Sequence, residues 1–349
     1  MIDYLIVGHG LAGAVLSQEL LKAGKTVMVL DDPSISSASE VAAGLYNPVT
    51  GRKMVKTWNA DKLFPEIEPF YSSLEKQINA NFFHPIGIYR PFLSVEEQNE
   101  WQGKVATKEY IPYVERIFTS SRKEYLLHDE HGGLLLKNAG YVDTKVLINA
   151  NKKFLMNKGN YLESMFKNHL LEEEVGYCRY EGLEFKKLIF CNGFNQQGNT
   201  WFDWLPFRPV KGEILRVEVE NKIDTILNRG IFILPLNEKY CRIGSTYNWR
   251  KIDNLPSEEG KNEIEDKLKK LYKGNYKIAD ADAGIRPATK DRRPFMGLHP
   301  ENEHIGIFNG FGSKGVSLIP FYAKNFVEYL EKGGELDAEV DVYRYFSLS

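Results

Sequence analysis

The chain has 349 residues, which is long enough for two domains. Its formal net charge is −2, so it has no overall basic charge that would attract nucleic acid, and nucleic acid could bind only at a local basic face. The N-terminal apolar run is too short for a signal peptide and no run approaches the length of a membrane span, so we expect no contact with a membrane. Three scattered cysteines, Cys178, Cys191 and Cys241, form no Cys-x-x-Cys pair and no disulfide framework, which favours the reducing cytoplasm.

The first residues predict a strand–turn–helix–strand unit of the kind that binds a dinucleotide. The apolar run Ile2–Val7 leads into the glycine motif Gly8–Gly13, and the predicted helix Leu11–Ala23 begins within this motif. A glycine ends the helix, and the predicted strand Thr26–Leu30 then leads directly to Asp31. This full context makes the motif stronger than three spaced glycines alone.

Each glycine of the motif has its own role in this interpretation. Gly8 permits the tight turn, Gly10 lets the backbone approach the phosphates, and Gly13 lets the helix pack close to the strand. The helix N-terminus offers free N–H groups and a partial positive charge to an anion. Asp31 is placed to accept hydrogen bonds from a ribose. The motif by itself does not separate NAD from FAD.

The rest of the chain alternates helical and strand-like patterns. In chain order, the predicted elements are the Ser-, Ala- and Gly-rich loop Pro33–Arg52, the helix Ala60–Asn79, the short strands Gly87–Phe92 and Tyr125–Leu127, the helix Asp143–Lys158 capped by Asp143 or Thr144, the strands Tyr161–Phe166, Glu184–Cys191 and Lys211–Glu220, the hairpin of Ile231–Leu236 and Tyr240–Ser245, the charged helix Ser257–Lys273, the strand His304–Phe308, the turn Gly310–Gly315 and the helix Val316–Leu330. Pro320 lies inside the last helix and leaves the carbonyl four residues earlier without its usual partner.

Elements of the dinucleotide-binding type therefore occur at both ends and in the middle of the chain. We expect an α/β protein with a discontinuous Rossmann-like domain of residues 1–55, 137–205 and 275–349. Residues 56–136 and 206–274 are expected to form a second, mixed-sheet α+β domain that binds the substrate. This interleaving favours FAD, because simple nicotinamide dehydrogenases more often keep the nucleotide domain contiguous.

Seven segments in order resemble the D-amino-acid-oxidase-like superfamily of FAD enzymes, which includes glycine oxidase and sarcosine oxidase. They are GHGLAG with VLDD, SASEVAAGLYNPV, GYVDTKVL, KKLIFCNG, RPVKGEILRVE, CRIGSTYN, and AGIRPATKDRRPFMG with FNGFGSKGVSLIP. The NPV, GSTY and Gly-Ser-Lys-Gly segments also resemble the oxidoreductase half of the bifunctional tRNA wobble-uridine modification enzyme. We expect no counterpart of the methyltransferase half of that enzyme in these 349 residues.

The resemblance implies an oxidoreductase that oxidises the C–N bond of a small amine or amino acid by hydride transfer to FAD, giving an imine that hydrolyses. Its partners would be that substrate and molecular oxygen or another electron acceptor. Ala279–Asp291 contains no cysteine where members with covalent flavin have one, so the resemblance implies noncovalent FAD. The residues expected at the cofactor are Gly8, Gly10, Leu11, Ala12, Gly13, Asp31, Asp32, Ser39, Ala43, Gly44, Leu45, Phe166, Asn192, Gly193, Gly312, Ser313, Lys314, Gly315 and Val316.

At the substrate, the resemblance implies that Arg286 pairs with a carboxylate, because a guanidinium group binds a carboxylate through two parallel hydrogen bonds. A structural ion pair is the alternative role for this arginine. Lys314 is a candidate second anchor for the substrate or a candidate for promoting the reaction with oxygen, and Arg242 is a further candidate for the reaction with oxygen. Both could instead be surface or phosphate-facing charges. Phe232 and Tyr247 either wall the substrate pocket or pack in the core.

Two other functions stay open. One is an oxidoreductase acting on a carboxymethylaminomethyl group of a tRNA base, with Arg52, Lys53 and Lys56 as contributors to a basic face. The other is a flavin-binding module without turnover. His128 and His131 read as parts of a polar turn, and we expect no metal site.

Overall fold

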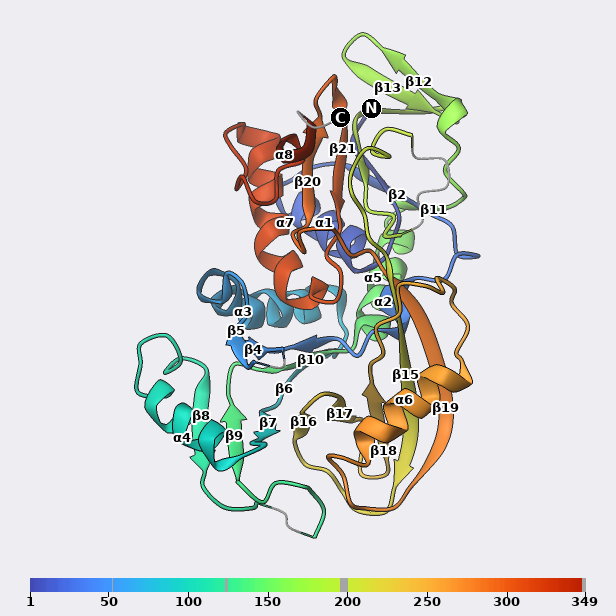
Figure 1. The fold of residues 1–349 in the computed structure, drawn as a ribbon. Helices are drawn as coiled ribbons and strands as arrows, with labels where there is room; N and C mark the ends of the chain where they lie inside the picture. The colour runs from blue at the N-terminus through green and yellow to red at the C-terminus, as the bar shows by residue number, and fades with distance from the viewer. Residues whose placement is uncertain (52, 123–124, 195–199, 347–349) are drawn as a thin grey trace.

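The computed structural model describes residues 1–51, 53–122, 125–194 and 200–346. Within these residues, two large mixed sheets lie in the two halves of the molecule (Figure 1). The first sheet holds β1 (Ile2–Val7) at its centre, with parallel neighbours on both sides. Its other strands are β2 (Val27–Asp31), β11 (Tyr161–Glu163), β12 (Leu171–Glu174), β13 (Tyr177–Tyr180), β14 (Leu183–Phe190), β20 (Phe295–His299) and β21 (Asn302–Asn309).

The parallel part of this sheet runs in the order β11-β2-β1-β14-β21. Val7 is paired with Leu30 and with Phe190, so the carboxyl ends of three strands meet at one edge. β1 is buried from Tyr4 to Val7 because helices and aromatic side chains cover both faces of the sheet. The loops that follow these strands therefore share one edge, where α/β folds bind ligands.

Helices pack on one face of the first sheet and are held by one apolar cluster. They are α1 (Leu11–Lys22), α3 (Ala60–Ile78), α5 (Thr144–Asn157) and α7 (Gly315–Lys332). The side chain of Asp143 accepts the N–H of Val146 and caps α5, so of the two predicted caps Asp143 is the one used. The short helix α8 (Tyr343–Phe346) ends the described part of the chain.

The second sheet has the strand order β19-β15-β18-β17-β16-β7-β9-β8. These strands are β7 (Ile88–Pro91), β8 (Val114–Phe118), β9 (Gly133–Leu136), β15 (Val210–Val219), β16 (Ile226–Asn228), β17 (Phe232–Pro235), β18 (Tyr240–Gly244) and β19 (Tyr276–Arg286). The helix α6 (Glu258–Leu268) packs on it through Ile264 and Leu268, while α4 (Val95–Lys104) buries Trp101 in a neighbouring cluster. Short strands join the two halves: β3 (Leu45–Tyr46), β4 (Val49–Thr50), β5 (Val55–Lys56), β6 (Phe83–Pro85) and β10 (Gly140–Val142).

This architecture confirms the expected α/β fold with a parallel cofactor-type sheet and a second mixed sheet. The predicted domain bounds stay a prediction, and two elements cross them. β19 lies within the predicted segment 275–349 but pairs along its length with β15 of the second sheet. α3 lies within the predicted segment 56–136 but packs against α7 on the first sheet.

Two of the predicted elements are wrong. The segment expected to be a plain loop contains α2 (Ala38–Val41) and the strands β3 and β4, while Arg52 lies outside the described residues. Tyr125–Leu127 does not form a strand, and Leu127 makes one isolated bridge to Tyr272. Their apolar side chains suggested a strand, but Leu126 and Leu127 are instead buried in an apolar cluster without strand pairing.

Pro320 in α7 has the consequence that the sequence predicts. The missing N–H leaves the carbonyl of Val316 free, and this carbonyl accepts the hydroxyl hydrogen of Tyr71 at 2.8 Å. Tyr71 is fully buried on α3, so the hydroxyl group would otherwise also lack a partner. The bond joins α3 to the first turn of α7, which lies at the edge of the cleft described next.

Candidate functional site

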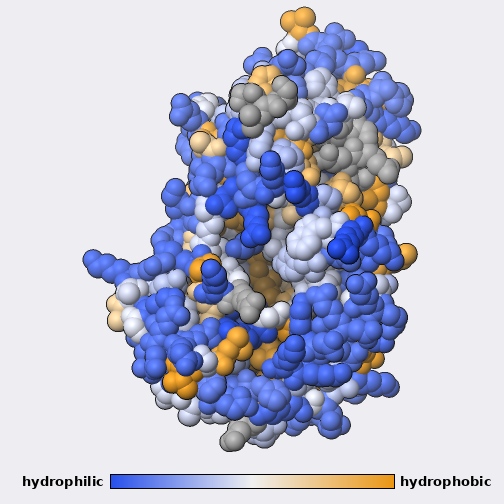
Figure 2. Space-filling model, in the orientation of Figure 1, coloured by the Kyte–Doolittle hydropathy of each residue, from blue (hydrophilic) through white to orange (hydrophobic). Residues whose placement is uncertain are grey.

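A cleft of about 1560 Å³ runs between the two halves of the molecule. It exceeds the size of a typical small-ligand pocket and has room for an elongated ligand together with a second one. Figure 2 shows it as a hollow in the middle of this face, with polar side chains around its opening. Among the predicted site residues, all line this cleft except Gly13 and Arg242.

The glycine motif after β1 closes one end of the cleft. Gly8 has φ +98°, and a Cβ atom there would lie 2.7 Å from Cα of Asn192. A Cβ atom on Gly13 would lie 2.0 Å from the carbonyl oxygen of Gly8, so Gly13 allows α1 to pack against the loop, as predicted. Gly10 is the N-cap of α1 and supplies no capping side chain. The N–H of Leu11 donates to the hydroxyl of Ser39 at 3.1 Å, and the N–H groups that follow in the first turn can bind an anion.

Asp31 lies at the tip of β2 and connects three segments. One carboxylate oxygen accepts the backbone N–H of His9 at 2.8 Å, and the other accepts the hydroxyl group of Tyr161 at 2.8 Å. Burial, and then the charge of Asp31, raises the pKa of Tyr161, so this hydroxyl remains a donor. A carboxylate has further lone pairs, so Asp31 can still accept a hydrogen bond from a ribose in the cleft.

His9 is buried against Asn151 and Tyr161, and burial lowers the pKa of its imidazole to about 4. The neutral ring is a packing element of the loop. Neither Tyr161 nor Asn151 is a predicted site residue. Only the tertiary structure brings them to the motif, because α5 and β11 follow it by more than a hundred residues.

The other end of the cleft is formed by the glycine-rich turn between β21 and α7. Gly310 and Gly312 have φ values of +80° and +55°, which favour glycine. Asn309 donates from its side chain to the carbonyl of Gly193 at 2.8 Å and so joins the ends of β21 and β14. The first turn of α7 then lines the cleft through Gly315 and Val316. Two helix N-termini, those of α1 and α7, thus border one cleft, and each favours negative charge.

Arg286 ends β19 on the wall formed by the second sheet. Its guanidinium group donates to the carbonyl of Thr246 at 3.2 Å and to the hydroxyl of Ser245 at 2.8 Å. Its Cζ lies 4.4 Å from the centre of the Tyr247 ring. Burial lowers the pKa of Arg286, while Tyr247 acts in the opposite direction. Among the residues that the structure describes, no carboxylate lies within ion-pair distance of this guanidinium group, which argues against the structural ion pair.

Phe232 and Tyr247 both line the cleft beside Arg286. Phe232 is partly buried on β17, whereas Tyr247 is 51% exposed and packs at an angle against Trp249. Ser245 and Thr246 were missed as partners of Arg286. Both residues belong to the segment CRIGSTYN, one of the seven segments that resemble the family, and this resemblance is the signal that could have pointed to them.

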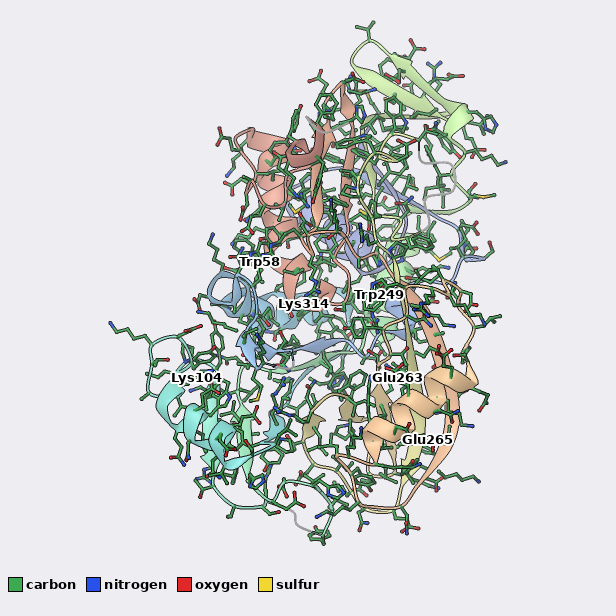
Figure 3. All side chains as sticks on the ribbon, in the orientation of Figure 1. Trp58, Lys104, Trp249, Glu263, Glu265 and Lys314 are labelled. Carbon is green, nitrogen blue, oxygen red and sulfur yellow. The ribbon has the colours of Figure 1, made fainter. Side chains whose placement is uncertain are left out.

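Lys314 is the N-cap of α7, and its ammonium group lies 3.3 Å from the hydroxyl of Thr50. Burial, followed by the charges of Arg293 and Arg292, lowers its pKa. Figure 3 shows Lys314 and Trp249 at the level where the two halves of the molecule meet. Arg242, in contrast, donates to the carbonyl of Ala42 at 3.3 Å and is not among the residues that line the cleft.

The cleft lining is strongly basic, although the whole chain is slightly acidic. Within the described ranges, its carboxylates are those of Asp31 and Asp32. The basic side chains of the lining are Lys56, Arg90, Arg208, Arg229, Lys267, Lys270, Arg286, Lys290, Arg292, Arg293 and Lys314. Such a lining attracts anions and repels cations as they approach.

The predicted basic contributors have different positions. Lys56 lines the cleft but pairs with Asp61 at 2.8 Å, Lys53 is exposed outside the cleft lining, and Arg52 lies outside the described residues. In the part of the chain that the structure describes, the three cysteines are free and buried, and no group of His, Cys, Asp or Glu residues has the arrangement of a metal site. None of the described helices combines the length and apolar character needed to cross a bilayer.

Comparison with known proteins gives a consistent picture. The sequence model of the family described as DAO, FAD dependent oxidoreductase, matches residues 3–329. The chain is 32% identical over 118 residues to the glycine oxidase of Bacillus licheniformis, which covers 33% of this chain and 32% of that protein. It is 24% identical over 354 residues to the bifunctional protein ThiO/ThiG of Trichormus variabilis, which covers 94% of this chain and 52% of that protein.

A third relative is the tRNA 5-methylaminomethyl-2-thiouridine biosynthesis bifunctional protein MnmC of Legionella pneumophila, at 22% identity over 85% of this chain and 45% of that protein. The chain thus spans about a third to a half of the length of these curated relatives. Among solved structures, the iminodiacetate oxidase of Chelativorans sp. has a TM-score of 0.79 at 18% identity, covering 98% of both chains. The glycine oxidase of Geobacillus kaustophilus has a TM-score of 0.77 at 20% identity, covering 97% of this chain and 96% of that one. These structural similarities support the fold.

Proposed function

Since this chain belongs to the DAO family of FAD-dependent oxidoreductases, we propose that it oxidises the C–N bond of a small amine or amino acid that bears a carboxylate. The observation that carries the proposal is Arg286, a partly buried cation that faces the cleft and has no carboxylate partner among the described residues. A cation held in this way is stabilised when an anionic ligand supplies the missing charge. A substrate carboxylate is the matching group.

The residues of the cleft fit the cofactor. The N-terminus of α1, with Gly8 and Gly10, would hold the pyrophosphate, and Asp31 would accept hydrogen bonds from the ribose. The turn before α7, with Gly312 and Ser313, would hold the other end. When bound, FAD supplies the electron acceptor for the hydride that leaves the substrate carbon.

Binding without a covalent bond is part of the proposal. Cys178 and Cys241 do not line the cleft. Cys191 does line it, but beside Gly8 and Gly13 rather than at the turn before α7, and burial raises the pKa of its thiol, so it remains protonated. The cytoplasmic location also stays a prediction.

The chain's own residues would orient the substrate and remove water from it. Arg286 fixes the carboxylate, and a fixed carboxylate restricts where the neighbouring carbon can lie. Phe232 and Tyr247 cover the adjacent wall and desolvate the amine, which favours its neutral form. The N–H groups of α7 would stabilise negative charge that develops at the turn end of the cleft.

An anaerobic screen tests this function. The FAD-loaded protein is mixed with glycine, sarcosine, proline and D-amino acids, and the flavin absorption is followed. Bleaching by one of them that is weakened in Arg286→Ala supports the proposal and eliminates a flavin-binding module without turnover. Bleaching that does not depend on Arg286 would refute the carboxylate assignment.

A second function, oxidation of a carboxymethylaminomethyl group on a tRNA base, is favoured by one observation. The cleft lining is rich in basic side chains, and Tyr247 and Trp249 lie exposed at it, as expected for a surface that stacks on bases and contacts phosphates. Retention of tRNA that weakens steeply with salt would support this function, because phosphate contacts release counterions. No retention at low salt would exclude it.

A further inference from the structure

Strand β15 presents different side chains to its two sides. Val210, Gly212 and Ile214 line the cleft, whereas Lys211 and Glu213 lie between them in sequence and are absent from its lining. Lys211 and Glu213 are 0% and 3% exposed. Alternation along the strand thus places two buried charges directly behind the wall that carries Arg286.

These two charges belong to one network with the loop before α6. The ammonium group of Lys211 lies 2.6 Å from a carboxylate oxygen of Asp253 and 3.4 Å from one of Glu213, and it also donates to the carbonyl of Leu255. The carboxylate of Glu213 accepts the N–H of Ser257 at 2.7 Å and its hydroxyl at 2.9 Å. Burying such charges is costly unless each is paired, and here each one is.

The network and β15 together fix the segment of residues 245–257. The hydroxyl of Thr246 accepts the N–H of Glu213 at 2.9 Å, and Asn248 exchanges two backbone hydrogen bonds with Lys211. Ser257 at the far end is held by Glu213. The start of the same segment, Ser245 to Tyr247, is what contacts the guanidinium group of Arg286.

We propose that Lys211, Glu213, Asp253 and Ser257 are positioning residues that hold this segment in the one arrangement that aims Arg286 into the cleft. The inference rests on the proposed function, in which Arg286 binds the substrate carboxylate. A long arginine side chain has many rotamers, and acceptors fixed in advance reduce the entropy lost when the substrate binds. The buried charges therefore act on substrate affinity through this segment and do not themselves line the cleft.

The test uses Glu213→Gln and Asp253→Asn in the FAD-loaded protein, with the substrate found in the anaerobic screen. We expect KM to rise about tenfold and kcat to stay within about twofold, because a fixed carboxylate contact contributes equally to the ground state and the transition state. The Kd of acetate, measured from its effect on the flavin absorption, should rise by a similar factor. A residue with only a structural role would not separate KM from kcat.

Limited trypsin digestion of the apoprotein tests the same segment without the cofactor. Arg250 and Lys251 lie exposed within the segment, and loosening the network should accelerate cleavage there in the apoprotein. The matched control is Lys222→Ala, which breaks an exposed ion pair with Glu238 in the same half of the molecule. If Glu213→Gln does not fold, Ser257→Ala replaces it in every measurement, because this change removes the hydroxyl that donates to Glu213 and accepts the N–H of Gly260 at the start of α6.

The outcomes separate the two proposals. If folded network variants keep the wild-type KM, acetate Kd and cleavage rate while Arg286→Lys weakens both binding measurements, the positioning proposal is wrong and the proposed function stands. If Arg286→Lys also leaves both unchanged, the proposed function itself fails.

Discussion

The guanidinium group of Arg286 occupies the space that a side chain at Gly212 would need. A Cβ atom built on Gly212 would lie 1.9 Å from Nη2 and 2.2 Å from Cζ of Arg286. The backbone of Gly212 is paired in register with Gly284 of the neighbouring strand, so the strand cannot move away alone. The absence of a side chain at position 212 thus sets where the guanidinium group of Arg286 can lie.

The change Gly212→Ala should therefore displace the guanidinium group without unfolding the sheet, because the clashing atoms are the end of a flexible side chain. We expect KM for a carboxylate-bearing amine to rise about tenfold or more, which corresponds to about 1.4 kcal/mol. FAD content should stay unchanged. Gly103→Ala is the control, since nothing lies within 4 Å of its added Cβ atom. An unchanged KM would contradict this account of Arg286.

Arg286→Lys keeps the positive charge but loses the planar guanidinium group that can donate two parallel hydrogen bonds to a carboxylate. A charge-assisted bidentate contact is worth roughly 1.5–3 kcal/mol more than no contact, so we expect KM to rise by about 10- to 100-fold. Steady-state kinetics at saturating acceptor measures it. Arg216→Lys, an exposed position on β15, should leave KM at the wild-type value. Equal effects of the two changes would rule out the carboxylate contact.

Lys314 gives a prediction about pH. Burial and two neighbouring arginines lower its pKa below the usual 10.5, so its positive charge is present at low pH and is lost at a lower pH than for an ordinary lysine. If this charge promotes the reaction of reduced flavin with oxygen, the rate should fall as pH rises through the lowered pKa. Stopped-flow reoxidation from pH 6 to about pH 10.5 measures this rate. Lys314→Met should be slower at low pH and lose this pH dependence, and an identical profile in the variant would exclude the role.

Tyr71 gives a prediction about stability. Tyr71→Phe removes the donor for the Val316 carbonyl that Pro320 leaves free, and an unpaired buried carbonyl costs about 1–3 kcal/mol. We expect the free energy of unfolding to fall by that amount in urea, with KM unchanged. Tyr343→Phe removes an exposed hydroxyl and should leave the stability unchanged. A stable Tyr71→Phe variant would mean that water replaces the hydroxyl.

Local patterns predicted much of the fold because their causes are local. The glycine motif, the Asp143 cap and the consequence of Pro320 each depend on residues within one turn or one strand end. The predictions that were wrong depended on contacts between residues distant in sequence. Tyr125–Leu127 has the apolar character of a strand, but Leu126 and Leu127 are buried in a cluster with Leu271 and Tyr272, which are distant in sequence. The small strands within Pro33–Arg52 form only because β10 and β5 supply their partners.

The sequence by itself determined the cofactor-type unit, the family and the identity of the candidate substrate arginine, because backbone conformation and motif chemistry are encoded in short segments. Only the tertiary structure decided that Arg286 has no carboxylate partner among the described residues, that Asp31 is shared with Tyr161, and that the cleft of a slightly acidic chain is basic. Each of these depends on which distant side chains meet, and pairing and burial of charge are properties of the packed chain rather than of any segment.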